Sequence, residues 1–148
     1  MVNVQVVNDS ITVANRLRPV LLKLNRELRR EVHSLGVSGY QVSLLIAIKQ
    51  TPGIGIRGLA AQERMSPAGM SGRVARLEAA GLVQRTADEQ DRRRQGLTLT
   101  SAGEGVLRSV KRRRTAWLAE RLKGLDEAEL EAVDAAIEPL LGLLAENE

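Results

Sequence analysis

The chain has no cysteine and almost no aromatic residues, which excludes cysteine-dependent sites and a core built from aromatic side chains. Its 148 residues include one Trp, one Tyr and no Phe. Without cysteine the chain has no disulfide, no thiolate zinc site and no cysteine-based redox switch. With aromatic residues at 1% of the chain, Leu, Val, Ile and Ala must build the core, and the 43% apolar content is sufficient for one domain.

Long hydrophobic runs are also missing. No apolar stretch approaches the roughly 20 residues that span a bilayer. The N-terminal segment lacks the apolar centre of a secretory signal peptide. We therefore expect a cytoplasmic protein with no membrane partner.

Residues that carry catalysis are scarce. The one histidine, His33, falls near the end of a predicted helix, where a surface role is the simpler interpretation. No glycine-rich phosphate loop is present, and the acidic residues form no cluster apart from helix caps and surface charge. We therefore expect no enzyme activity, no metal site and no cofactor.

Charge is distributed unevenly along the chain. Residues 57–123 carry fifteen Lys and Arg against seven Asp and Glu, whereas residues 124–148 carry eight acidic residues and no basic one. A basic middle beside an acidic end is typical of a protein that turns one surface toward nucleic acid and another away from it. An alternative, which is compatible with DNA binding, is that the acidic end pairs with the basic N-terminal helix.

The spacing of apolar residues predicts a mainly α-helical protein with one small β-hairpin. We expect a hairpin over about 82–87 and 96–100, with residues 54–56 as a candidate third strand, and Val42, Leu45, Ile46 and Ala47 facing inward. The predicted helices cover about 10–33, 39–50, 57–63 and 67–80, then a long helix from about 101 to Gly124 and a last helix after Asp126.

The first helix and the last two are long relative to the unit that they flank. Their apolar stripes exceed what a lobe as small as residues 38–100 can cover. A second copy of the chain is the simplest partner, and a two-fold dimer presents two copies of any binding surface. The alternative is a helical bundle within a monomer.

The helix predicted over 67–80 has two distinct faces. Ser66 is a favourable N-cap, Pro67 occupies the first helical position, and Met70, Val74 and Leu77 recur on one face. The opposite face is rich in alanine and glycine, so the helix backbone can lie close to a partner; packing against protein is the alternative. The residues of this segment that we predict to contact DNA are Ser66, Ala68, Gly69, Ser71, Gly72, Arg73 and Arg76.

The hairpin carries an arginine-rich tip. The tip includes Asp91, Arg92, Arg93 and Arg94, and Asp91 can brace a neighbouring arginine. A helix fits the major groove of DNA, and an arginine on a thin hairpin fits the narrower minor groove. We predict that these four residues contact the minor groove and phosphates, the alternative being a solvated charge run.

With these motifs in place, the chain closely resembles the MarR family of bacterial transcription regulators over nearly its whole length. Asp91-Arg92-Arg93 followed by the segment 97–103, Leu-Thr-Leu-Thr-Ser-Ala-Gly, is similar to the family's wing motif and following helix start. The pairs Leu59-Ala60, Ser66-Pro67 and Leu77-Glu78 and the segment 80–83, Ala-Gly-Leu-Val, are similar to its helix-turn-helix pattern.

The resemblance implies a fold and a function. It implies one domain over 1–148, with a winged helix-turn-helix lobe at about 38–100 and N- and C-terminal dimerisation helices at about 8–35 and 101–148. It implies a sequence-specific regulator of transcription, a repressor, that binds double-stranded DNA as a homodimer on a pseudo-palindromic operator. In that reading Arg93 enters the minor groove and Asp91 orients the wing.

Two features of the family bear on regulation. Many relatives release DNA when a small aromatic or phenolic ligand binds between the dimerisation helices and the winged lobe, so such a ligand is a candidate partner. Some relatives sense peroxide through a cysteine, and this mechanism is excluded here because the chain has no cysteine. On the helix predicted over 67–80, Gly72 stands where relatives often carry a larger polar or basic residue. The rival function is a helical protein–protein interaction module without specific DNA binding.

Overall fold

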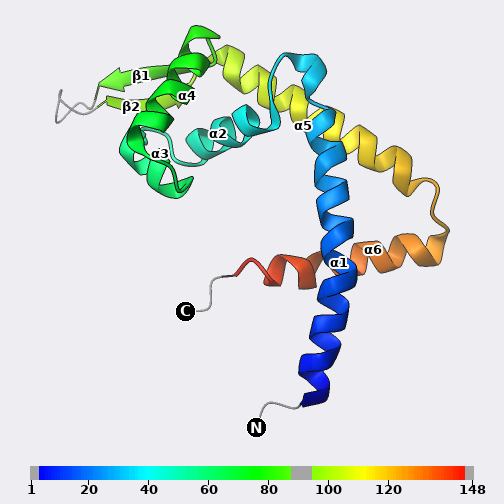
Figure 1. Cartoon of the computed structure of the whole chain (residues 1–148). Coiled ribbons are helices and arrows are strands. Elements are labelled where there is room, and N and C mark those ends of the chain that lie inside the picture. The colour runs from blue at the N-terminus through cyan, green and yellow to red at the C-terminus, as the bar shows by residue number, and fades with distance from the viewer. Residues whose placement is uncertain (1–3, 88–94, 146–148) are drawn as a thin grey trace.

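The computed structural model describes residues 4–87 and 95–145. It is mainly helical with a single two-stranded hairpin among those residues, which confirms the predicted fold class of a winged helix-turn-helix with long terminal helices (Figure 1). Its elements are α1 (Val4–Arg30), a 3-10 turn (His33–Leu35), α2 (Gly39–Gln50), α3 (Ile56–Gln62), α4 (Pro67–Ala79), β1 (Val83–Ala87), β2 (Gln95–Leu99), α5 (Ser101–Leu122) and α6 (Glu127–Gly142).

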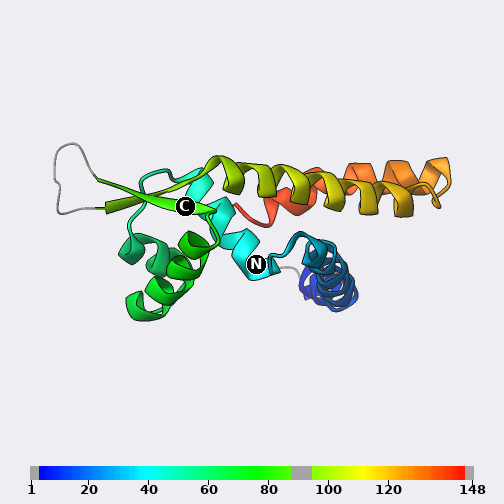
Figure 2. The same cartoon turned by 90° about the horizontal axis from the view of Figure 1, so that it is seen from above.

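The molecule consists of a compact lobe and extended helices. The lobe contains α2, α3, α4, the hairpin and the first part of α5, while α1 and α6 reach away from it (Figure 1). From above, α5 runs as one rod from the wing strands to α6 (Figure 2). The far end of α5 and helix α6 therefore lie on the side of the lobe opposite to Ala87 and Gln95, the outer ends of the two wing strands.

The core of the lobe is aliphatic, as the lack of aromatic residues requires. It draws on every element of the lobe, and the largest fully buried side chains are Leu44, Leu45, Ile48, Leu59, Met70, Leu77, Leu97, Val32, Val42 and Val74. One prediction for α2 was wrong, because Ile46 is 38% exposed. Since α2 packs against both β2 and α5, its buried residues do not follow one narrow stripe, and Ile46 lines a groove beside α5.

The hairpin is joined to the loop that precedes α3. β1 pairs antiparallel with β2, with Val83 opposite Leu99. The predicted third strand is reduced to one bridge between Ile54 and Leu97, because the chain enters α3 at Ile56. The Gly53 amide donates to the Leu97 carbonyl at 2.9 Å, and the Leu97 amide donates to the Ile54 carbonyl at 2.8 Å.

The starts of three helices follow local signals in the sequence. Ser38 with Gln41 and Asp126 with Glu129 form capping boxes at the starts of α2 and α6. The cap of α5 is Thr100, whose hydroxyl accepts from the Gly103 amide at 3.1 Å and donates to the Gly81 carbonyl at 2.6 Å.

The first helix begins and ends earlier than predicted. α1 spans Val4–Arg30 with Pro19 inside it, whereas the sequence pattern indicated about 10–33. Gly36, with φ of 76°, therefore ends the 3-10 turn at His33–Leu35 and not the long helix itself. Within the described residues, no helix is long and apolar enough to cross a membrane.

Candidate nucleic-acid interface

Helix α4 presents its small-residue face to solvent. The Ser66 hydroxyl accepts from the Gly69 amide at 3.1 Å, which fixes where the helix begins. Met70, Val74 and Leu77 are fully buried, so the remaining face points outward. Every residue of this segment that we predicted to contact DNA is exposed: Ser66, Ala68, Gly69, Ser71, Gly72, Arg73 and Arg76.

Arg73 lies at the edge of α4 that faces α2. Its guanidinium carbon is 4.1 Å from the centre of the Tyr40 ring, a cation–π contact that sequence reasoning missed. The Tyr40 hydroxyl in turn contacts the Met65 sulfur at 2.8 Å. Arg73 and Arg76 both border a shallow hollow between α2 and α4. The Arg73 charge therefore lies on the flank of the helix, above the aromatic ring.

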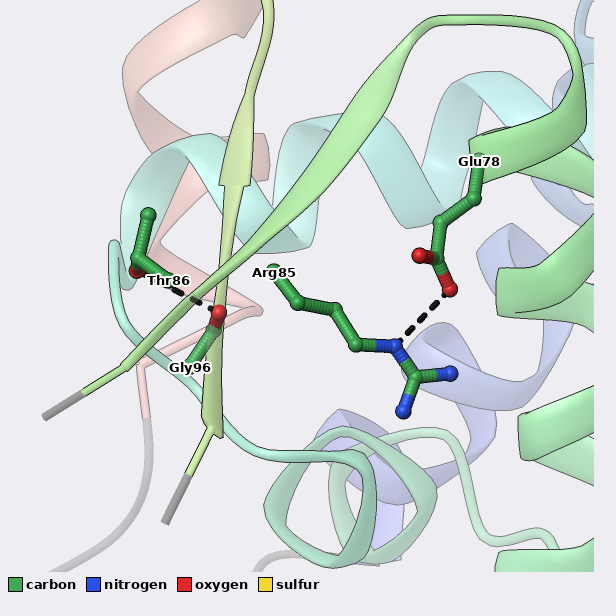
Figure 3. A network of polar contacts seen from close by, with 4 residues as sticks. All are labelled: Glu78, Arg85, Thr86 and Gly96. Carbon is green, nitrogen blue, oxygen red and sulfur yellow. Dashed lines mark hydrogen bonds and ion pairs between the residues drawn. The ribbon is translucent and has the colours of Figure 1, made fainter. Parts of the chain in front are cut away.

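An ion pair connects the wing to α4. The Arg85 Nε donates to the Glu78 carboxylate at 2.9 Å, with about one third of each side chain exposed (Figure 3). One residue further along β1, the Thr86 hydroxyl donates to the Gly96 carbonyl of β2 at 3.4 Å. Sequence reasoning singled out neither Arg85 nor its partnership with Glu78, because the pairing depends on how the strand lies against the helix.

A cleft of about 890 Å³ opens between the start of α3 and the hairpin. Arg57, on the first turn of α3, is an exposed cation on one wall, and Arg85 is on the other. A further group of polar and small residues lines the cleft, namely Gly53, Gly55, Thr86, Gln95 and Gly96. The sequence pattern predicted no DNA contact for Arg57. Arg57 lies two residues after Gly55, the N-cap of α3.

The predicted wing contacts are not tested by the structure. Asp91, Arg92, Arg93 and Arg94 lie outside the described residues, between the end of β1 at Ala87 and the start of β2 at Gln95. Their assignment to DNA contact stays a prediction.

A second groove, of about 490 Å³, lies between α2 and α5. Its apolar lining comes from Ile46, Leu107, Val110 and Leu118 and its basic lining from Lys49, Arg108, Lys111 and Arg114.

Two basic residues of this groove have partners in the protein. The Arg114 Nε donates to the Leu28 carbonyl at 3.1 Å, which ties α5 to α1. Burial, and secondarily the charge of Arg29, lowers the pKa of Arg114 from its ordinary value. Lys49 pairs with Glu104 at 2.9 Å.

The long helices leave their apolar stripes uncovered within one chain. Ile11, Val20 and Leu21 of α1 are about half exposed, at 55%, 51% and 45%. Val133 and Ile137 of α6 are similar, at 45% and 48%. The bundle that was the alternative to a dimer is thus not formed by these side chains, because they would be buried in it.

The described parts of the chain hold no cluster of metal-binding side chains. Across residues 4–87 and 95–145 no group of three or more His, Cys, Asp or Glu side chains is gathered closely enough to hold a metal ion.

Comparisons with known proteins identify the family. The model of the MarR family matches residues 38–94. An HTH-type transcriptional regulator of Mycobacterium bovis is 30% identical over 91% of this chain and 94% of its own length. The crystal structure of a transcriptional regulator from Pseudomonas aeruginosa is 34% identical, with a TM-score of 0.79 over 95% of this chain and 99% of that one.

The fold is also that of a protein solved with DNA. A variant of MepR from Staphylococcus aureus, bound to an oligodeoxyribonucleotide, shares 20% identity and a TM-score of 0.69 over 90% of this chain and 98% of that one. Three findings indicate the same family. The exposed face of α4 lies beside a hairpin, the family model matches the lobe, and a helix-turn-helix regulator is similar over 91% of this chain. This chain belongs to the MarR family and is a DNA-binding regulator of transcription.

Proposed function

We propose that the protein is a repressor that binds a pseudo-palindromic operator as a homodimer. The observation that carries the proposal is the uncovered small-residue face of α4, placed beside the wing on a lobe whose attached helices expose apolar stripes. As a regulator of bacterial genes it acts in the cytoplasm, where the chromosome lies, and has no enzyme activity.

In this proposal α4 enters the major groove with its backbone close to the bases. Ala68, Gly69 and Gly72 leave space for that approach, and a methyl group added at Gly72 would meet no atom of the protein. Arg76 is the long side chain of α4 best placed for base edges, while Arg73, held over Tyr40, lies toward the flanking phosphates. Ser66 and Ser71 complete the helix contacts.

The wing tip supplies the minor-groove contacts. Arg93 enters the groove, Asp91 orients the wing, and Arg92 and Arg94 contact phosphates. Arg93→Ala should weaken operator binding by about 1–3 kcal/mol. Arg92→Ala and Arg94→Ala should instead weaken binding to all duplexes alike and flatten the salt dependence. Mobility shifts on an operator and on an unrelated duplex measure both effects, and equal salt-independent losses at all three positions would contradict the assignment.

The apolar stripes of α1 and α6, which lie within the regions 8–35 and 101–148, form the dimer interface. α6 carries acidic residues and α1 carries basic ones, so the two helices are complementary in charge as well as apolar. Two-fold symmetry then places the two copies of α4 in successive major grooves, about 34–36 Å or about 10 bp apart.

The groove between α2 and α5 is the proposed site for a small aromatic or phenolic ligand. Its floor is apolar and its rim is basic, which fits a flat apolar body with a phenolate or carboxylate group. Trp117 lies on α5 close in sequence to the groove residues Arg114 and Leu118, and it is the one tryptophan of the chain. Titration with phenol and benzoate, followed by Trp117 fluorescence and by DNA release, tests the site.

One experiment separates the proposal from the rival interaction module. Fragments of the source genome are selected on the purified protein, and the recovered fragments are tested by mobility shift at two salt concentrations. A repressor should enrich fragments with inverted half-sites and lose affinity steeply as salt rises. Recovery of unrelated fragments, bound with no preference over bulk DNA, would favour the interaction module.

A further inference from the structure

The cleft between α3 and the wing carries a positive charge, that of Arg57, which takes part in none of the contacts proposed so far. Arg57 is exposed on the first turn of α3 and borders this cleft. Arg85, on the opposite wall, is already paired with Glu78. Within residues 4–87 and 95–145 no ion pair involves Arg57. Among the described residues, Arg57 is therefore a cation of the cleft that has no acidic partner.

Arg57 is held at a fixed place relative to the wing. Two hydrogen bonds join the loop before α3 to Leu97 of β2, and the loop and strand also pack closely. A Cβ added at Gly96 would lie only 2.5 Å from the Gly53 carbonyl oxygen, so no side chain separates the two backbones. Arg57 lies three residues beyond Ile54, the last residue of this junction, so the junction ties the position of the Arg57 backbone to that of β2.

The shape of duplex DNA indicates what this cleft meets. One sugar-phosphate strand separates a major groove from the adjacent minor groove. When α4 lies in the major groove and the wing tip in the minor groove, that strand crosses the protein surface between them. The Glu78–Arg85 ion pair spans this surface from α4 to β1 (Figure 3), and Arg85 also lines the cleft.

We propose that the cleft receives the sugar-phosphate strand that separates the two grooves, and that the Arg57 guanidinium binds one of its phosphates. The inference rests on DNA binding by α4 and the wing, and it adds a contact between them. A phosphate contact carries no base information, so Arg57 fixes the register and angle of the wing and raises affinity for every sequence equally. Arg57 is thus a positioning residue for the wing.

The test compares Arg57→Gln with Arg113→Gln. Both variants remove one exposed positive charge, but Arg113 lies on α5, away from the cleft. Affinity for the selected operator and for a random duplex is measured over a range of salt concentrations. Losing one phosphate contact should lower the slope of log affinity against log salt by about 0.9 and weaken binding about five- to tenfold near 0.1 M salt.

Arg57→Gln should lose affinity equally on the operator and on the random duplex, and Arg57→Lys should recover most of it. Arg113→Gln should retain the wild-type slope. If Arg57→Gln and Arg113→Gln give the same slope and affinity while the wild type binds its operator, the cleft assignment is overturned and the regulator function stands. A wild type with no preference for any operator would overturn the function instead.

Combining changes in the DNA with the Arg57→Gln variant locates the phosphate that Arg57 contacts. Single phosphates of the operator are replaced in turn by uncharged methylphosphonate. One replacement, on the strand between the helix site and the wing site, should weaken the wild type but have no further effect on Arg57→Gln. Additive losses at every phosphate would contradict the proposal. Urea unfolding of each variant verifies that the exposed substitution leaves the fold intact.

Discussion

At the scale of single residues, Arg64 has an uncommon backbone. It has φ of 53°, the one positive value outside glycine among the described residues, and it ends α3 in the left-handed conformation. Its amide and that of Met65 donate to the Ala61 and Ala60 carbonyls at 3.3 Å and 2.9 Å, which closes the helix. Glycine is the usual residue at this kind of helix end.

We expect Arg64→Gly to stabilise the free protein by about 0.5–1 kcal/mol, because the release of left-handed strain exceeds the added flexibility of the unfolded chain. Gly36→Ala is the matched opposite, since Gly36 has φ of 76° and open space around its Cα. It should destabilise by about 1 kcal/mol. Urea unfolding at one fixed protein concentration measures both. If the two substitutions shift the midpoint in the same direction, backbone conformation is not the controlling factor.

Gly72 is a second residue at which one substitution should act differently on stability and on DNA binding. It lies inside α4 with open space around its Cα, so Gly72→Ala should stabilise the free protein by up to about 1 kcal/mol through helix propensity. The same methyl group faces the major groove in the proposed complex and should weaken operator binding. Unfolding curves and mobility shifts on one preparation measure the two effects. A variant that is more stable and binds as tightly as the wild type would show that the α4 backbone does not lie close to the bases.

At the scale of elements, the start of α5 is pressed against the turn that joins α4 to β1. A Cβ added at Gly103 would overlap the Leu82 carbonyl oxygen. Gly105, two residues further along the same helix, has only the far end of Arg108 near its Cα. The two glycines therefore provide a matched pair for measuring this contact.

Gly103→Ala should destabilise the fold by about 2–4 kcal/mol, because backbone has to move to admit one methyl group. Gly105→Ala should be neutral or stabilise by up to about 1 kcal/mol through helix propensity. Chemical unfolding monitored by circular dichroism provides the comparison. Similar small effects at both positions would show that the packing of α5 against the turn at Leu82 adapts without strain.

The elements themselves follow from signals that are local in sequence. Ser66, Ser38 and Asp126 cap helices through residues only three positions away, so the sequence alone identifies where α4, α2 and α6 begin. The exposure of the α4 face follows equally from the periodicity of its apolar residues. Contacts between elements were not predictable in the same way. The Arg73–Tyr40 contact and the Glu78–Arg85 pair depend on how helix, strand and neighbouring helix pack, which periodicity does not specify.

At the scale of the whole molecule, the uncovered stripes of α1 and α6 determine the expected assembly. Ile137→Glu should dissociate the dimer at micromolar concentration, because it places an unpaired charge in an apolar interface. Ile137→Leu should remain dimeric. Light scattering reports the mass, and a footprint on the operator should lose one half-site when the dimer dissociates. A wild-type monomer that binds the operator with full affinity would contradict this assembly.

Helix α5 joins that interface to the wing with no hinge between them. β2 ends at Leu99, and the helix of 22 residues begins at Ser101, so one residue separates strand from helix. At 1.5 Å per residue the helix is about 33 Å long and acts as a lever arm. A tilt of about 10° at its far end moves the wing by roughly 6 Å, about the full width of the minor groove. The angle at which two copies meet therefore decides whether both wings can enter one DNA duplex at the same time.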